Sequence, residues 1–133
     1  MPSPTALTLQ ALRRHGFNAD VVERFLPRIE RRHDLFGCID IIAVDRREPG
    51  ILGVQATSLP HVAERLTKAR GKPELSAWLR AGGRFEVWGW YKRAGEWRVK
   101  VMAVRPGDLE AVPLQAPARR GRRAKQKGLF DGV

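Results

Sequence analysis

Two neighbouring stretches, CIDIIAV at residues 38–44 and ILGVQATS at residues 51–58, decide the fold of this chain. Both are short apolar runs separated by the turn-forming DRREPG, so the pattern predicts two adjacent β-strands. Each strand carries polar side chains within its apolar run: Asp40 in the first, Gln55 and Thr57 in the second. Residues two apart on a strand share a face, so Asp40 can lie opposite Gln55 and Thr57 if the strands pair.

The sequence around these strands predicts an α/β domain with one mixed β-sheet flanked by helices. A helix is expected before the two strands, and two helices and a hairpin after them. Gly16, Gly71 and the pair Gly82-Gly83 mark helix ends. The expected elements are a helix at 5–15, strands at 18–27, 28–37, 38–44 and 51–58, helices at 61–70 and 73–83, and hairpin strands at 84–92 and 97–104. Trp88 and Trp90 alternate onto one face of the hairpin, where core packing is favoured over a base-stacking surface.

The length and composition indicate one folded domain followed by a tail. A chain of 133 residues with 43% hydrophobic residues suits a single core. Towards the C-terminus the chain becomes rich in Pro, Gly, Ala and Arg, so we expect a domain over residues 1–110 and a disordered basic tail over 111–133. No signal peptide or apolar run of about 18 residues is present. We therefore expect a cytoplasmic protein without a membrane partner, and the lone Cys38 excludes an internal disulfide.

The charge of the chain favours a polyanionic partner. Twenty-five Lys and Arg oppose 14 Asp and Glu, giving a formal net charge of +11. Residues 1–114 hold 19 of these bases and 13 of the acids, so the domain is basic without its tail. Because neutralised phosphates release condensed counterions, the simplest partner is a nucleic acid, and we expect DNA.

The polar groups on the two central strands indicate a site for a hard cation. Burying the Asp40 carboxylate costs free energy unless it is paired or binds a cation. A site built only from oxygen ligands suits Mg²⁺, or Mn²⁺ in its place, with water and phosphate filling the remaining positions. Asp34, six residues before Asp40, is a candidate second ligand. An alternative for Asp34 is a turn in which its side chain bonds its own backbone. The three histidines have no ligand spacing.

An aspartate in a strand reading DIIA, a turn, and a strand with paired polar residues before a basic helix is similar to the PD-(D/E)XK nuclease superfamily. Within it, the segment from RRHDLFGCIDIIAV to AWLRAGGRFEVWGW resembles Holliday junction resolvases and small phage endonucleases. The resemblance covers about residues 5–104. It implies a restriction-endonuclease-like core and Mg²⁺-dependent hydrolysis of DNA phosphodiesters, with a role in phage or bacterial DNA metabolism.

The same resemblance implies roles for individual residues. Asp40 corresponds to the metal-binding aspartate, Gln55 stands at the position of the second acid, and Thr57 at that of the lysine. A Gln carbonyl can still ligate Mg²⁺, but a Thr supplies no positive charge. Glu64 and Lys68, one turn apart on the following helix, are candidates to replace the missing acid and lysine. The alternative for Glu64 is an exposed residue paired with Lys68.

Basic residues near the predicted site and in the tail are candidates for phosphate contacts. They are Arg28, Arg31, Arg32, Arg65, Lys72, Arg119, Arg120, Arg122 and Arg123. The alternative is a solvated charged surface.

The tail segment QKGLF resembles peptides that bind the bacterial sliding clamp, with Gln126, Leu129 and Phe130 as the contacting residues. Chance, or folding back onto the domain, is the alternative explanation.

Three functions follow from these patterns. The first is a metal-dependent endonuclease acting on linear or branched DNA. The second is a catalytically impaired DNA-binding module on the same fold. The third is an accessory protein that docks on the clamp through its tail. Cutting both strands of a junction would favour a two-fold homodimer.

Overall fold

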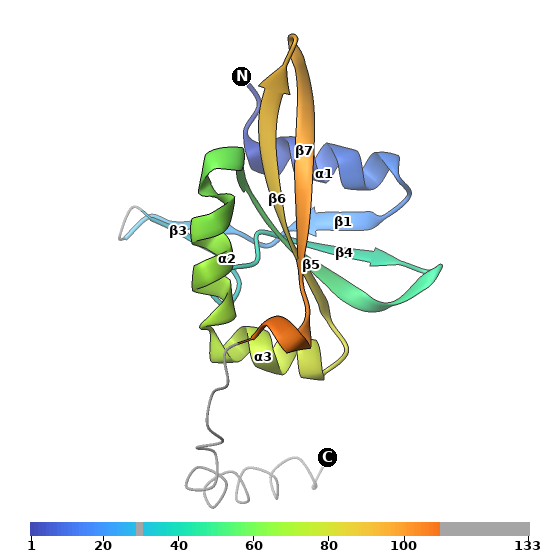
Figure 1. The fold of residues 1–133 in the computed structure, drawn as a ribbon, viewed down its shortest axis with the longest axis vertical. Coiled ribbons are helices and arrows are strands. Elements are labelled where there is room, and N and C mark those ends of the chain that lie inside the picture. Colours follow the sequence, from blue (N-terminus) through green and yellow to red (C-terminus); the bar gives the residue numbers. More distant parts are fainter. Residues whose placement is uncertain (29–30, 110–133) are drawn as a thin grey trace, which may run out of the picture.

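The computed structural model describes residues 1–28 and 31–109 of the chain. A mixed five-stranded sheet with the order β1-β4-β5-β6-β7 forms its centre, and β2 and β3 form a separate two-stranded hairpin (Figure 1). The strands are β1 (Asn18–Val21), β2 (Arg24–Leu26), β3 (Arg31–His33), β4 (Ile41–Asp45), β5 (Glu48–Ser58), β6 (Arg84–Arg93) and β7 (Glu96–Val104). The helices are α1 (Pro4–Arg14), α2 (Val62–Arg70) and α3 (Pro73–Arg80), with short 3-10 turns η1 (Leu59–His61) and η2 (Pro106–Asp108).

The two central strands pair as their sequence pattern predicts. β4 runs antiparallel to β5, with Ile41 opposite Val54. β5 and β6 are parallel, which requires the crossover that η1, α2 and α3 provide. The α/β class, the mixed sheet and the flanking helices are therefore confirmed.

Two hydrophobic clusters cover the two faces of the sheet. On one face α1 contributes Leu12, which packs with Ile41, Val54 and neighbouring residues. On the other face α2 and α3 pack against β6 through residues such as Leu66 and Leu75. Trp88 and Trp90 are both buried beneath α1, so the expectation of core packing is confirmed. At Gly89, between them, an added Cβ would collide with Val62, and this close approach of α2 to β6 requires glycine.

The expected strand at 18–27 is divided, which corrects the sequence prediction. β1 ends at Val21, and the backbone N–H groups of Val22 and Glu23 both donate to the Asp40 carbonyl, at 2.8 and 3.2 Å. The chain then leaves the main sheet and forms β2, which pairs only with β3. In the main sheet β1 pairs with β4, and the last residue pair of this ladder is Val21 with Ile41. The pairing with β4 therefore ends before β2 begins.

The expected strands at 28–37 and 38–44 are also shorter than predicted. β3 covers only Arg31–His33, and β4 begins at Ile41. Between them the chain turns through Phe36 and Gly37, which both have positive φ angles of 57° and 73°. A backbone bond from the Leu35 N–H to the Ile39 carbonyl, 2.9 Å, closes this turn. The apolar run in this segment therefore lines a tight turn and only afterwards becomes a strand.

We predict that Thr8→Val lowers the free energy of unfolding by about 1–3 kcal/mol, because it leaves a buried indole N–H unpaired. Thr8 is completely buried, and its hydroxyl accepts a 2.8 Å hydrogen bond from Trp90 Nε1 while it donates to the Pro4 carbonyl. Urea denaturation measures the change. The matched control is Thr67→Val, because the exposed Thr67 hydroxyl bonds only within its own helix. An equal loss in both variants would contradict the assigned role of the Thr8–Trp90 bond.

Candidate metal centre

Asp40 lies directly before β4 and is only 4% exposed. Its backbone N–H donates to the Val54 carbonyl at 2.9 Å, and its carboxylate Oδ2 accepts the Ala56 N–H at 2.8 Å. These two bonds reach the residues on either side of Gln55. The side chain of Asp40 thus adds one hydrogen bond to β5 beyond the end of the β4–β5 ladder. This bond places the Asp40 carboxylate beside Gln55.

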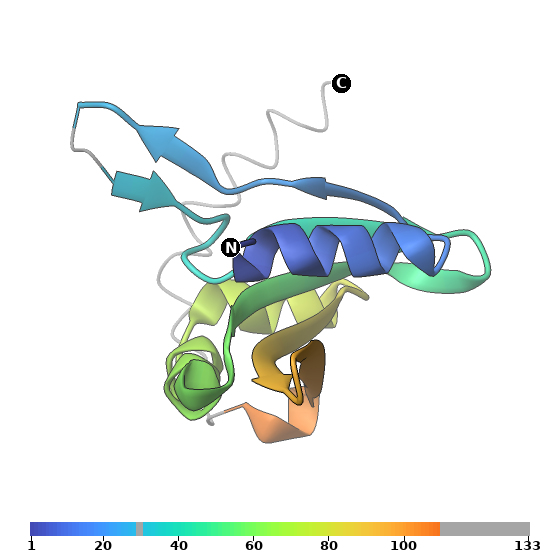
Figure 2. The same cartoon turned by 90° about the horizontal axis from the view of Figure 1, so that it is seen from above.

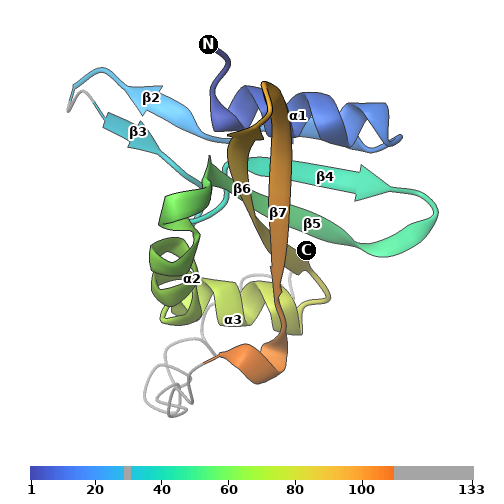
Figure 3. The ribbon, with the colours of Figure 1, turned by 45° about the horizontal axis from the view of Figure 1, so that its top comes forward.

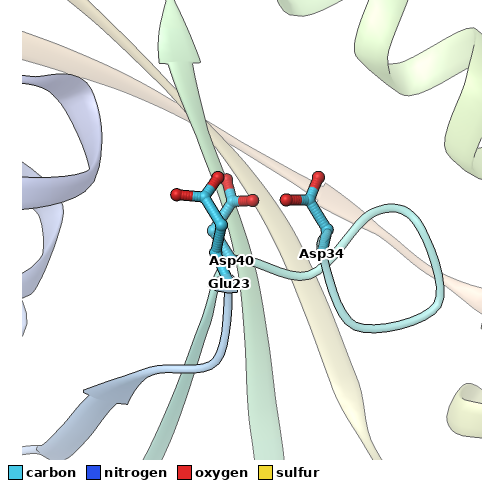
Figure 4. A group of neighbouring side chains, drawn as sticks. All are labelled: Glu23, Asp34 and Asp40. Carbon is cyan, nitrogen blue, oxygen red and sulfur yellow. The ribbon is translucent and has the colours of Figure 1, made fainter. Parts of the chain in front are cut away.

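Three carboxylates converge at this point (Figure 4). Glu23, Asp34 and Asp40 each place one oxygen so that all three oxygens lie within 4.8 Å of one another. Asp40 is buried, whereas Glu23 and Asp34 are half-buried. Three carboxylates this close cannot all be ionised without a cost in free energy, and carboxylate oxygens are the ligands that hard divalent ions prefer. The group could therefore hold a metal ion.

Each carboxylate reaches the group from a different part of the chain. Glu23 follows β1, and its N–H bonds the Asp40 carbonyl. Asp34 follows β3 and begins the turn that leads back to β4, where its carbonyl accepts the Gly37 N–H at 3.1 Å. This turn is closed by the Asp34 backbone and not by the Asp34 side chain, so it is not the side-chain turn considered as the alternative. The Asp34 side chain instead points towards the other two carboxylates (Figure 4).

Burial dominates the electrostatics of Asp40. The pKa of the Asp40 carboxyl is raised from 3.8 to about 8; burial is the largest cause, and the neighbouring Asp34 and Glu23 carboxylates act in the same direction. The hydrogen bond from the Ala56 N–H acts in the opposite direction, because it favours the charged form. Without a cation, Asp40 therefore holds a proton near neutral pH. A divalent ion would have to displace that proton, so its affinity should rise with pH.

Gln55 and Thr57 extend this polar region along β5. Their side chains are 5% and 6% exposed, and within the described part of the chain neither has a hydrogen-bond partner. Val54, between Gly53 and Gln55, packs into the cluster under α1, so Gln55 and Thr57 lie on the opposite face of the sheet. Two buried polar side chains without protein partners beside three carboxylates are positioned for water or a ligand.

Glu64 and Lys68, the expected replacements for an acid and a lysine, are both exposed on α2. Glu64 is not a member of the carboxylate group. The third carboxylate of the group is Glu23, which was not predicted from the sequence. Assigning residues 18–27 to one strand concealed it, because the break at Val22–Glu23 depends on the Asp40 carbonyl. The sequence did contain one usable feature: Glu23 closely follows residues 18–21, a stretch that can pair antiparallel with the strand DIIAV.

The structure describes some of the other residues that were predicted to contact phosphate or a partner protein. Lys72 is the N-cap residue directly before α3, and its ammonium lies against Gly37 in the turn between Asp34 and Cys38. Arg65 is half-buried on α2, and its Nε has no hydrogen-bond partner among the described residues. Arg28 is exposed, and Arg31 and Arg32 belong to β3. The arginines at 119, 120, 122 and 123 and the predicted clamp peptide at Gln126, Leu129 and Phe130 lie outside the described residues.

Cys38 is buried beside the centre, and burial raises the pKa of its thiol to about 11. In the absence of a metal the thiol therefore stays protonated at neutral pH and is a poor nucleophile. Among the described residues, every helix is too short or too polar to span a bilayer.

Comparison with known proteins gives no relative: no family model, no curated protein and no solved structure matches this chain.

Proposed function

We propose that this protein is a metal-dependent DNA endonuclease that hydrolyses phosphodiester bonds. The observation that carries the proposal is the convergence of Glu23, Asp34 and the buried Asp40 on one point beside β5. Without a ligand, this arrangement buries an acid among other acids and costs free energy. Binding of Mg²⁺ or Mn²⁺ would offset that cost, and an ion bound there would be available to substrate through the half-buried side of the group.

The arrangement of elements supports the proposal. The aspartate stands at the start of β4, the polar pair lies on the next strand, and the basic helix α2 follows. This order agrees with the restriction-endonuclease-like core implied by the resemblance to PD-(D/E)XK nucleases. The chain carries a net charge of +11, which attracts a polyanion and would favour the approach of a phosphate despite the local charge of the carboxylates.

The roles of the residues follow from their positions. Glu23, Asp34 and Asp40 would hold the ion, which when bound supplies a Lewis acid for the phosphoryl oxygen and an activated water. The Gln55 amide, next to Asp40 and without a protein partner, would orient that water or a phosphate oxygen. Arg65 lies on α2 and Lys72 directly before α3, and both would hold the DNA backbone.

A DNA-binding module without catalysis is the second candidate, and the uncharged pair Gln55 and Thr57 favours it. Neither side chain supplies a positive charge to stabilise the developing phosphorane, and Lys68 is exposed on α2. In this alternative the carboxylate group binds an ion that positions DNA without activating water.

The test is incubation of the wild-type protein with linear, flapped and four-way DNA in Mg²⁺, in Mn²⁺ and in EDTA. We expect cleavage only with the divalent ions, and Glu23→Gln should reduce the rate at least tenfold by removing one ligand charge. The control is Glu96→Gln, which removes an exposed charge from the β6–β7 turn. If none of these DNAs is cut although the protein binds them, the non-catalytic module is the correct assignment.

A further inference from the structure

Strands β2 and β3 form a two-stranded hairpin outside the main sheet, and we call its described residues, 24–28 and 31–33, the arm. Its strands pair only with each other, with Arg24 opposite His33 and Leu26 opposite Arg31. Figures 2 and 3 show the arm projecting from the body of the molecule, away from the five-stranded sheet. An isolated two-stranded hairpin is at best marginally stable in water, so the placement of the arm depends on its two attachment points.

Both attachment points carry a carboxylate of the metal centre. Glu23 directly precedes β2, and Asp34 directly follows β3. The two oxygens that these residues bring to the group lie within 4.8 Å of each other and of an Asp40 oxygen. Figure 4 shows the chain entering from β1 at Glu23 and leaving through the turn after Asp34. A single ion on this group would therefore connect both ends of the arm to the start of β4.

The sequence of the arm suits a polyanion. The sequence from residue 24 to residue 33 holds four arginines, at 24, 28, 31 and 32, against one acid, Glu30. Arginine is the preferred side chain for bidentate contacts with phosphate. A two-stranded β-ribbon also fits the major groove of B-DNA, and such ribbons are an established way to contact a duplex. Arg28, near the tip of the arm, is exposed.

We infer that the β2–β3 arm contacts the backbone of duplex DNA, and that divalent-ion binding at its two attachment points fixes the arm for this contact. DNA and metal then increase each other's affinity, because each ligand stabilises the same placement of the arm. The inference rests on the proposed function where it puts DNA next to the metal centre. It goes further by naming the contacting element and its coupling to the ion.

The test measures binding and does not depend on cleavage. The dissociation constant for a labelled 30-base-pair duplex is measured in Ca²⁺ and in EDTA, and gel analysis checks that the DNA stays intact. We expect Ca²⁺ to tighten wild-type binding about tenfold, within the usual range of coupling between two sites. The triple variant Arg28→Ala, Arg31→Ala, Arg32→Ala should lose about tenfold or more in affinity in Ca²⁺. It should also have a smaller salt dependence, by about 0.9 in log–log slope for each lost phosphate contact.

The matched control removes the same number of charges from the β6–β7 hairpin, through Arg93→Ala, Arg98→Ala and Lys100→Ala, which are all exposed. Its affinity should fall less than threefold, and its Ca²⁺ effect should be that of the wild type. Arg28→Ala alone changes one exposed residue and should give a smaller loss in the same direction. Ca²⁺ titration without DNA should give equal affinities for the wild type and the triple variant.

Equal losses in the arm and control variants would overturn the inference, because binding would then depend only on total charge. A wild-type affinity that is the same in Ca²⁺ and EDTA would overturn the coupling, and stronger binding to duplex RNA would overturn the assignment to DNA. If the wild type never cleaves but the arm variant loses binding, the endonuclease proposal fails and the arm inference stands.

Discussion

Asp40→Asn should reduce Mg²⁺-dependent DNA cleavage by about a thousandfold or more, since a divalent ion supplies several kcal/mol of transition-state stabilisation. Asp40 is the buried member of the carboxylate group, and the Ala56 N–H fixes its carboxylate. An Asn amide can still accept that bond through its oxygen but offers the ion no charge. DNA affinity should be unchanged or higher, because a negative charge near the phosphate is removed. Cleavage rates and a DNA-binding isotherm, each with and without Mg²⁺, measure both effects.

The control for this prediction is Asp20→Asn, whose side chain is 89% exposed and pairs only loosely with Arg13, at 3.8 Å. It changes the same functional group on β1 without altering the metal centre. Full Mg²⁺-dependent activity in Asp40→Asn would remove the basis of the proposed function. Equal losses of activity in the two variants would show that the assay reports net charge.

The second large effect is on stability and depends on pH. The pKa of Asp40 is about 8 in the folded protein and near 3.8 when the chain is unfolded, so the folded state binds more protons between these values. In EDTA, Asp40 therefore lowers stability progressively as the pH rises from about 4 to about 8. The slope approaches about 1.4 kcal/mol per pH unit in the middle of that range. Above pH 8 the full cost is present, and below pH 4 it vanishes.

Urea denaturation of the wild type and Asp40→Asn at several pH values in EDTA isolates this contribution. Other groups titrate too: Arg47, for example, holds the pKa of Asp45 below its usual range and so acts with the opposite sign. These contributions cancel in the difference between the two proteins. We expect Asp40→Asn to gain stability relative to the wild type as pH rises from 4 to 8. A difference that stays constant with pH would contradict the burial of an ionisable Asp40.

A divalent ion should reverse this loss. Millimolar Mn²⁺ should raise the midpoint of thermal unfolding of the wild type more at pH 8 than at pH 5, because protons compete with the ion for the carboxylates. Asp40→Asn should show a much smaller shift at either pH.

Much of the framework could be predicted from local pattern. The alternating run at 51–58, the glycine-bounded helices on either side of Pro73 and the terminal hairpin each carry their own periodicity and end signals. Asp40 and Gln55 were identified for the same reason, since polar side chains in apolar strands are conspicuous without a structure. Asp34 was a candidate from its spacing, with a turn as its alternative.

The segment from Val22 to Ile39 was the least predictable. Its residues have ordinary strand propensity, but where the strands begin and end depends on partners distant in sequence. The two N–H groups that bond the Asp40 carbonyl end β1, and the turn with positive φ at Phe36 and Gly37 delays β4 until Ile41. Sequence reasoning therefore extended three strands too far and overlooked Glu23.

The amino-acid sequence by itself determined the class of the domain, its basic charge, and the presence of an aspartate that an apolar strand would not need. Hydrophobic periodicity and composition are local properties, so they can be read along the chain. Tertiary structure alone decided that Glu23, at the other end of the hairpin from Asp34, joins Asp34 and Asp40. The position of Glu23 depends on backbone hydrogen bonds between segments separated in sequence, and no local sequence feature distinguishes Glu23 from other acidic residues.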